Sequence, residues 1–227
     1  MSVLSTIVFV TGTDTDVGKT ITTAAIATTL SQRNQSVAVY KPTQAGTVNG
    51  RGDIDVVREL AGLDHVHEGI RLRYPMAPVA AAARARVKLP SAHDHATAIQ
   101  QLAATHDHVL VEGAGGLLVA LDEAGRTIAD IATSVPAACT AVVVCRSGLG
   151  TLNHTALTLE ALNRRNIPVA GIVIGSWPQQ PTDIDLSNRD DLNNHEAPLI
   201  GAIPEGAAAL SRTQFRAAVD DWLQIER

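Results

Sequence analysis

The sequence predicts an α/β fold with a doubly wound, mainly parallel sheet flanked by helices. Short β-branched runs alternate with segments of helical length, as in parallel strands joined by helical crossovers. The chain has 227 residues and is 45% hydrophobic but only 3% aromatic, which suits aliphatic layers between helices and a sheet. We found no linker or internal repeat, so we expect residues 1–227 to form one domain.

The first half of the chain supplies two strands and several helices. A strand is expected at residues 6–11, before a glycine-containing loop and a helix from 19 to about 33. A second strand, 36–41, is expected to end at Pro42, because proline cannot donate a hydrogen bond to a sheet. After a glycine-punctuated loop, helical segments are predicted over about 54–62, 77–86 and 91–104.

The second half repeats the alternation of strand and helix. Short β-branched runs predict buried parallel strands at 109–111, 140–145, 169–174 and 199–203. Helices are predicted at 152–165 and, closing the chain, at about 211–225. Ligands of such sheets gather at the carboxyl ends of the strands, and the motifs described next all follow strands.

Charge and composition exclude several classes of function. Lys and Arg number 18 against 23 Asp and Glu, a net charge of −5, and no basic run offers a face to nucleic acid. The amino terminus has no charged n-region, and no window approaches 18 apolar residues, so we expect a cytoplasmic protein without a membrane segment. Cys139 and Cys145 fit neither metal spacing nor a disulfide framework and are expected to be buried thiols.

The loop 12–20, Gly-Thr-Asp-Thr-Asp-Val-Gly-Lys-Thr, resembles a phosphate-binding loop. It follows a strand and opens a helix, where backbone N–H groups and the helix dipole favour anions. Lys19 is expected to reach the β and γ phosphates and Thr20 to ligate magnesium. The first glycine, Gly12, lies one residue earlier than in the usual spacing, and a glycine turn with a solvated lysine is the alternative.

Two further strand ends carry charged residues. Glu112 opens the segment Glu-Gly-Ala-Gly-Gly after a hydrophobic strand, so its carboxylate is a candidate magnesium ligand, or else it caps a turn. Lys41 ends the second strand and points to the same edge unless it is simply solvated. Asp53 and Asp55 follow near a helix start, where either could hold magnesium or only complement the helix dipole.

The motifs together resemble dethiobiotin synthetases over nearly the whole chain. They are the loop at 12–20, Tyr40-Lys41-Pro42, the run 111–116 and the segment 149–154 (Leu-Gly-Thr-Leu-Asn-His). The resemblance implies a P-loop NTPase fold and an ATP-dependent ligase of biotin biosynthesis. Such an enzyme joins CO2 (from bicarbonate) to both amines of 7,8-diaminononanoate, with Mg2+ as cofactor, and works as a homodimer.

The resemblance also assigns roles to residues. Lys41 and Lys19 would be catalytic, Lys41 by holding the carbamate and the transferred phosphoryl group, and Thr20, Asp53 and Glu112 would hold magnesium. The nucleotide would contact Asp16, Val17, Gly18, Lys19, Thr20, Ile21, Asp53, Glu112, Gly113, Ala114 and Gly115. The substrate would contact Thr15, Lys41 and Ala45 and, through its carboxylate at the dimer interface, Gly150, Thr151, Leu152 and Asn153.

Two positions depart from the family pattern. Ala45 stands where the family usually has Ser or Thr, so Thr43 or a backbone N–H is expected to replace the missing hydroxyl. Some members bind adenine with an Asn-Asp pair after the strand at 169–174, whereas this chain has Gly175 and Ser176. The other candidates for contact with the base are Pro204, Glu205 and Gly206.

Two relatives and one metal hypothesis are disfavoured. A partitioning-type ATPase switch generally has an additional lysine early in its P-loop, and this loop has none before Lys19. A cobyrinate-type amidoligase usually carries a glutaminase domain, for which no residues remain. The His-x-His pairs at 65/67, 93/95 and 106/108 lack a third ligand at a recognisable spacing, so we expect solvated or hydrogen-bonded histidines.

Overall fold

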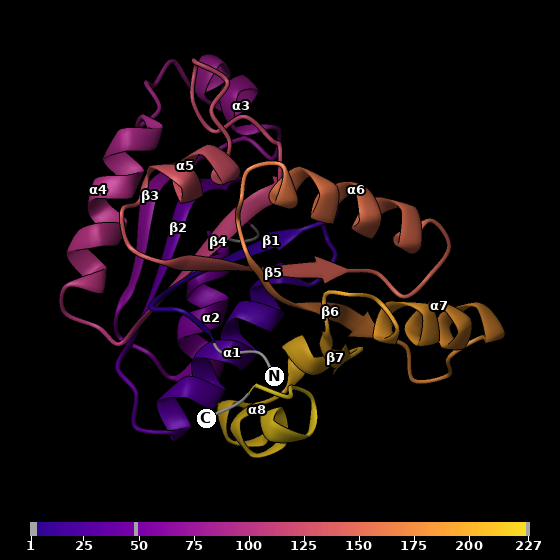
Figure 1. Cartoon of the computed structure of the whole chain (residues 1–227). Coiled ribbons are helices and arrows are strands. Elements are labelled where there is room, and N and C mark those ends of the chain that lie inside the picture. Colours follow the sequence, from indigo (N-terminus) through magenta and orange to yellow (C-terminus); the bar gives the residue numbers. More distant parts are fainter. Residues whose placement is uncertain (1–3, 48–49, 226–227) are drawn as a thin grey trace.

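The computed structural model describes residues 4–47 and 50–225, and these form one seven-stranded parallel sheet between two layers of helices (Figure 1). The strand order is β3-β2-β4-β1-β5-β6-β7. The strands are β1 Ile7–Gly12, β2 Val37–Ala45, β3 Val66–Leu72, β4 His108–Gly116, β5 Cys139–Cys145, β6 Val169–Trp177 and β7 Leu199–Pro204. The helices are α1 Lys19–Gln32, α2 Asp53–Ala61, α3 Pro78–Ala85, α4 Ala92–Ala103, α5 Ile128–Ser134, α6 Thr151–Asn163, α7 Asp183–Asn193 and α8 Arg212–Ala218, with short 3-10 turns at Ala207–Ala209 and Val219–Asp221.

The helices cover both faces of the sheet. Aliphatic side chains of α1, α2 and the carboxyl-terminal segment pack on one face, and those of α4, α5, α6 and α7 pack on the other. β1 lies at the centre, paired with β4 and β5, and all six of its residues are buried. The predicted doubly wound parallel sheet is therefore confirmed. None of the helices within the described ranges has the length and apolarity needed to cross a membrane.

Four predicted boundaries were wrong. The strand predicted at 109–111 runs on to Gly116, so Glu112 lies inside β4, and the strand predicted at 169–174 runs to Trp177. The second strand runs past Pro42 to Ala45, because its pairing with β4 ends at Tyr40 and it continues along β3 alone, so the missing N–H leaves no ladder bond unmade. The closing helix does not run to 225. It stops at Ala218, and Leu223 forms an antiparallel bridge with Gly201, whose lack of a side chain leaves room for the chain.

Three elements were missed by the sequence analysis. β3 is an edge strand whose buried ends enclose half-buried and exposed residues, with a glycine in the middle, so it has no continuous apolar run. α5 has only seven residues, and α7 is mostly polar. Their signals were weak because short elements and polar elements carry little hydrophobic periodicity.

The fold places the paired histidines in different surroundings. His95 is 1% exposed and its Nδ1 lies 2.8 Å from the hydroxyl of Tyr40, while His108 Nδ1 lies 3.0 Å from the carbonyl oxygen of Ser5. The rings of His65 and His106 come from different pairs and make an edge contact at 4.7 Å. Within residues 4–47 and 50–225, no group of three His, Cys, Asp or Glu is placed to hold a metal ion.

We predict that His95 makes the fold sensitive to acid. Burial lowers its pKa to about 4 from the ordinary 6.5, so between these values the unfolded chain binds a proton that the folded protein does not. The free energy of unfolding is therefore unaffected by the titration of this histidine above pH 6.5 and decreases as the pH falls towards 4, by up to about 3 kcal/mol. Urea unfolding at several pH values should show a shallower acid loss in His95→Gln, while exposed His93→Gln should follow the parent profile. Parallel profiles for all three proteins would contradict the prediction.

The end of β6 packs backbone against backbone on the loop before α1. A Cβ on Gly175 would lie 2.0 Å from the carbonyl oxygen of Val17, and a Cβ on Gly18 would lie 2.2 Å from that of Gly175. Only glycines allow this approach, since main-chain atoms cannot move aside as a flexible side chain does. The loop after β1 is thereby held against a strand two places away in the sheet.

We predict that Gly175→Ala lowers the free energy of unfolding by about 2–3 kcal/mol, because the added methyl overpacks fixed backbone. The matched control is Gly148→Ala, where a Cβ would meet nothing within 4 Å. Urea unfolding of both variants checks this, and equal stabilities would show that the contact is not as tight as described.

Candidate active site

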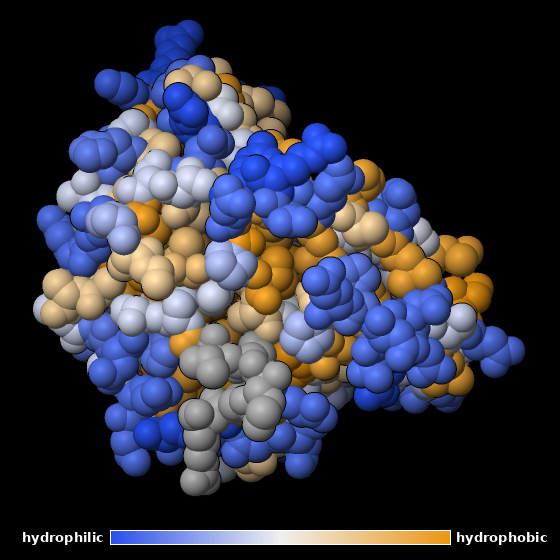
Figure 2. Space-filling model, viewed as in Figure 1, coloured by the Kyte–Doolittle hydropathy of each residue, from blue (hydrophilic) through white to orange (hydrophobic). Residues whose placement is uncertain are grey.

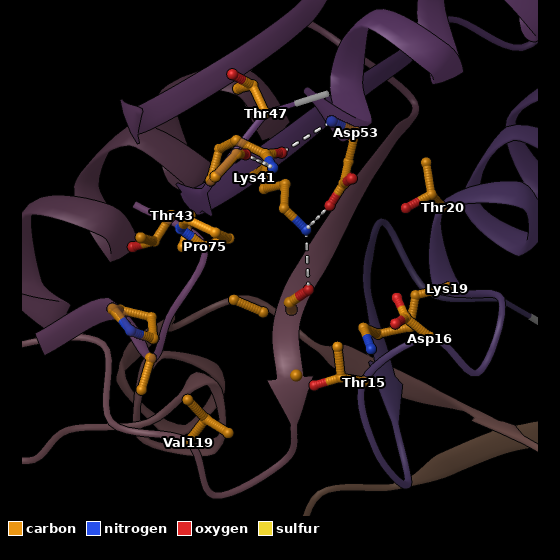
Figure 3. A pocket seen from close by; sticks show the side chains of 18 of the residues that line it. Thr15, Asp16, Lys19, Thr20, Lys41, Thr43, Thr47, Asp53, Pro75 and Val119 are labelled. Carbon is orange, nitrogen blue, oxygen red and sulfur yellow. Dashed lines mark hydrogen bonds and ion pairs between the residues drawn. The ribbon is translucent and has the colours of Figure 1, made fainter. Parts of the chain in front are cut away.

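The carboxyl ends of β1, β2 and β4 open on a cavity of about 990 Å³. Figure 3 shows Thr15, Lys19 and Thr20 on one side of it and Thr43, Pro75 and Val119 on the other. The cavity thus brings together the ends of strands that are separated in the sequence, as expected for ligand sites of doubly wound sheets. Its lining also includes Asp16, Gly18, Ile21, Lys41, Gln44, Ala45, Gly46, Thr47, Arg51, Asp53, Met76, Ala77, Pro78, Gly113, Ala114 and Gly115.

The loop between β1 and α1 has the geometry of a phosphate cradle. Gly18 is the N-cap of α1, has φ 96° and offers no side chain to cap the helix, so N–H groups of the first turn remain available to an anion. Gly12 is equally constrained, because a Cβ there would lie 2.8 Å from the carbonyl oxygen of Asp14 and 3.0 Å from Lys19 Nζ. The early glycine is therefore required by the tight path of this loop.

Lys19 folds back on its own loop. Its Nζ donates to the carbonyl oxygen of Asp14 at 2.7 Å. Burial, and after it the positive charge of Lys41, lowers the pKa of the Lys19 ammonium, although nearby carboxylates oppose this. From the end of β5, Arg146 donates to the Asp14 carboxylate at 3.0 Å and to the carbonyl oxygen of Thr15 at 3.1 Å. Arg146 thus ties the loop to the neighbouring strand.

Lys41 lies at the centre of the charged cluster. Its Nζ is 2.6 Å from Asp53 Oδ2 and 2.8 Å from Glu112 Oε1, and it donates to the carbonyl oxygen of Gly113 at 3.1 Å. Lys41 is 2% exposed and Glu112 is fully buried. Burial by itself would lower the pKa of Lys41, but the charges of Glu112 and Asp53 outweigh burial and raise it. The lysine is therefore a fixed cation in the wall of the cavity.

The residues fit a divalent cation. Thr20 Oγ1 donates to Glu112 Oε1 at 2.9 Å, so the hydroxyl and the carboxylate lie together. Asp53 belongs to the same cluster, because Lys41 Nζ contacts both Asp53 and Glu112. Among the described residues, the buried Glu112 Oε2 has no hydrogen-bond partner. A buried carboxylate oxygen without a partner is costly, and hard oxygen ligands of this kind are those that Mg2+ prefers.

The structure brings most of the predicted site residues to this one cavity. Val17 and Glu112 are buried behind its wall, and the other predicted residues of the phosphate loop, β2, α2 and β4 line it. The predicted base contacts lie at the ends of β6 and β7, outside the lining, and the predicted carboxylate contacts lie at the start of α6, also outside it. The residues outside are Gly175, Ser176, Pro204, Glu205 and Gly206, and Gly150, Thr151, Leu152 and Asn153.

Several residues near the cavity were not singled out from the sequence. Gln44 and Arg51 line it, and Pro75, Met76 and Ala77 form its far wall. No sequence signal marked Gln44, because the strand was expected to end before it and a spacing of three residues from Lys41 predicts the opposite face. The wall at 75–77 follows β3, which the sequence analysis missed, so no pattern placed it near the phosphate loop.

The departure at position 175 has a steric cause. An asparagine or any other side chain at Gly175 would clash with the main chain of the phosphate loop. Ala45 does line the cavity, and so does the buried Thr43, whose hydroxyl has no partner among the described residues. Thr43 and Ala45 are two residues apart on β2, so they lie on the same side of the strand.

Solved structures of P-loop proteins share the fold. The cell division ATPase MinD of Pyrococcus furiosus matches with a TM-score of 0.57 and 17% identity, covering 89% of this chain and 84% of that one. FlhF in complex with GMPPNP and Mg2+ matches with a TM-score of 0.55 and 14% identity, covering 96% and 75%. At these identities the likeness shows the P-loop NTPase fold alone.

Sequence relatives are much more similar. A protein of Parafrankia sp. (strain EAN1pec) named ATP-dependent dethiobiotin synthetase BioD is 49% identical over 211 residues, 92% of this chain and 88% of that protein. A Streptomyces avermitilis protein of the same name is 48% identical, over 96% and 91%. A family model described as an AAA domain matches residues 6–211. With this identity over nearly its full length, the chain belongs to the dethiobiotin synthetase family.

Proposed function

We propose that this chain is the ATP-dependent ligase that makes dethiobiotin in biotin biosynthesis, by joining CO2 to the two amines of 7,8-diaminononanoate. The observation that carries the proposal is the buried Lys41 ammonium, which shares one cavity with the phosphate loop. A fixed cation there can neutralise a carbamate and a phosphoryl group in transfer. Membership of the family supports the same reaction.

The reaction consists of carbamate formation, phosphoryl transfer and ring closure, which follow one another at the same site. One amine attacks CO2 and releases a proton to solvent as the carbamate forms, and a carbamate oxygen then attacks the γ-phosphorus of ATP, so that ADP leaves. The second amine then attacks the carbonyl carbon of the mixed anhydride and expels phosphate, to which its proton passes, and this closes the ureido ring. No step needs a covalent bond to the protein, so the enzyme acts by positioning the reactants and neutralising charge.

The phosphate loop and two lysines divide this work. The backbone of residues 16–21 binds the triphosphate, and Lys19 exchanges its contact with Asp14 for the β and γ phosphate oxygens. Lys41 binds the carbamate and the transferred phosphoryl oxygens. Thr15 also lines the cavity and is proposed to contact the substrate. Thr43 lines the cavity on the same side of β2 as Ala45, which has no hydroxyl.

Magnesium would be held by Thr20, Asp53 and Glu112, and when bound it would supply positive charge to the phosphate oxygens. Two observations support this ligand set. Thr20 contacts one oxygen of Glu112, and the other oxygen, Oε2, has no hydrogen-bond partner among the described residues. Lys41 already contacts both carboxylates, so the cluster is built to surround a cation.

A second copy of the chain is proposed to complete the substrate site. Gly150 caps α6 without a side chain, so the first-turn N–H groups of Thr151, Leu152 and Asn153 are candidates to receive the substrate carboxylate. Large apolar side chains are exposed there: Leu149 is 83% exposed and Leu157 57%. Figure 2 shows apolar residues at the surface near α6 among hydrophilic ones. Such a surface suits an interface between two protomers.

The base of the nucleotide is proposed to lie beyond the phosphate loop, at the ends of β6 and β7. Gly175 must remain a glycine, so contacts with the base fall to Ser176, Pro204, Glu205, Gly206 and to the main chain. The main chain there is held in place, because Glu205 N donates to the carbonyl oxygen of Trp177 at 2.7 Å.

We predict that the purified protein forms ADP and phosphate only when diaminononanoate, bicarbonate and Mg2+ are all present, because no acceptor exists until the carbamate forms. Coupled measurement of ADP, with each component omitted in turn, tests this. Equal turnover without the diamine would refute the proposed reaction and favour a plain ATPase.

We predict that Lys41→Ala lowers kcat by about 10²- to 10³-fold, because its charge is needed most as negative charge moves to the acceptor. Nucleotide binding, measured by calorimetry, should survive, since the phosphate loop is intact. Exposed Lys88→Ala is the matched control and should behave as the parent. An unchanged kcat in a folded Lys41→Ala protein would remove Lys41 from the mechanism.

A further inference from the structure

Gln44 is a buried polar side chain in the wall of the cavity, next to the charged cluster. It is 6% exposed and is the penultimate residue of β2, three residues after Lys41. A buried carboxamide needs partners for both its oxygen and its nitrogen. Gln44 finds both, and each partner is a main-chain group at the cavity.

The oxygen of Gln44 serves the start of α2. The N-cap of this helix is Gly52, which has no side chain to accept a hydrogen bond from the first turn. Gln44 Oε1 accepts instead from the N–H of Asp53, at 2.8 Å. A Cβ on Gly52 would lie 3.1 Å from Gln44 Cδ, so the glycine leaves room for the carboxamide. The helix is therefore capped from a neighbouring strand.

The nitrogen of Gln44 holds the segment that follows β2. Gln44 Nε2 donates to the carbonyl oxygen of Gly46 at 2.8 Å. Gly46 has φ 73°, and a Cβ on it would lie 2.7 Å from Pro75 Cβ, so the chain is closely packed at this turn. With a donor and an acceptor both engaged, the carboxamide is fixed in one orientation.

The start of α2 is also held from within the helix, because Asp55 Oδ2 accepts from Gly52 N at 2.8 Å. Gln44 adds a contact with Asp53 itself. The side chain of Asp53 is 37% exposed, whereas that of Glu112 is fully buried and enclosed by the sheet. The carboxylate of Asp53 nevertheless lies 2.6 Å from Lys41 Nζ. Asp55 fixes the residue before Asp53, whereas Gln44 accepts from the N–H of Asp53 itself and ties it to the end of β2.

We propose that Gln44 is a positioning residue, which holds Asp53 at the cation-binding point of the cavity by joining the end of β2 to the start of α2. The inference rests on the proposed function in one respect, the role of Asp53 as a metal ligand. Residues that orient metal ligands through hydrogen bonds influence metal affinity although they do not touch the metal.

The test compares three variants of the full chain. Gln44→Leu keeps the size of the side chain and removes both hydrogen bonds, whereas Gln44→Glu keeps an acceptor for the Asp53 N–H. The control is Gln214→Leu, because Gln214 also serves a helix start, accepting from Ser211 N at 3.1 Å and Ser211 Oγ at 2.8 Å, but lies on α8 away from the cavity.

Two measurements apply to each variant: hydrogen exchange of the Asp53 amide in the metal-free protein, and Mn2+ affinity by electron paramagnetic resonance with a nonhydrolysable ATP analogue. Gln44→Leu is expected to speed the exchange and to weaken Mn2+ binding by about tenfold. Gln44→Glu should weaken it less, and Gln214→Leu should change neither quantity.

Unchanged exchange or unchanged Mn2+ affinity in Gln44→Leu overturns the proposal, and so does an equal loss in Gln214→Leu, which would indicate general destabilisation. Failure of the proposed function has a different signature. In that case the parent protein forms no ADP with diaminononanoate and bicarbonate, while the exchange and Mn2+ measurements still decide the role of Gln44.

Discussion

The arrangement of the site depends on one buried charge, the ammonium of Lys41. A lysine that is 2% exposed loses almost all of its hydration, and this loss must be offset by fixed negative charge. Glu112 on β4 and Asp53 on α2 provide that charge, at 2.8 and 2.6 Å. The requirement fixes three elements relative to one another: the end of β2, the end of β4 and the start of α2.

The phosphate loop reaches the same point under a different constraint, which is steric. Gly12 leaves room for the loop to fold over itself, and Gly18 and Gly175 let the loop touch the end of β6. Because backbone packs on backbone, the position of the loop does not depend on side-chain rotamers. Lys19 and Thr20 thus enter a preformed site, in which Thr20 already contacts Glu112.

The helix starts differ in how they are capped. Four helices away from the cavity cap themselves with Ser91, Thr127, Thr182 and Ser211. α1, α2 and α6 begin after glycines, which have no side chain that could accept hydrogen bonds from the first N–H groups of the helix. At α2 the first N–H is taken by Gln44. At α1 and α6 no side chain caps the helix, which suits helices proposed to receive anionic groups.

The fold class, the phosphate loop and the charged residues Lys41 and Glu112 could be predicted from the sequence, because β-branched runs and glycine spacing are local signals. The pairing of these charges is a property of the three-dimensional fold. The tertiary structure placed Lys41 between Asp53 and Glu112, which are far apart in the chain, and it showed why position 175 must be glycine. Such contacts join residues distant in sequence, and no local pattern records them. For the same reason the roles of β3 and Gln44 came from the structure alone.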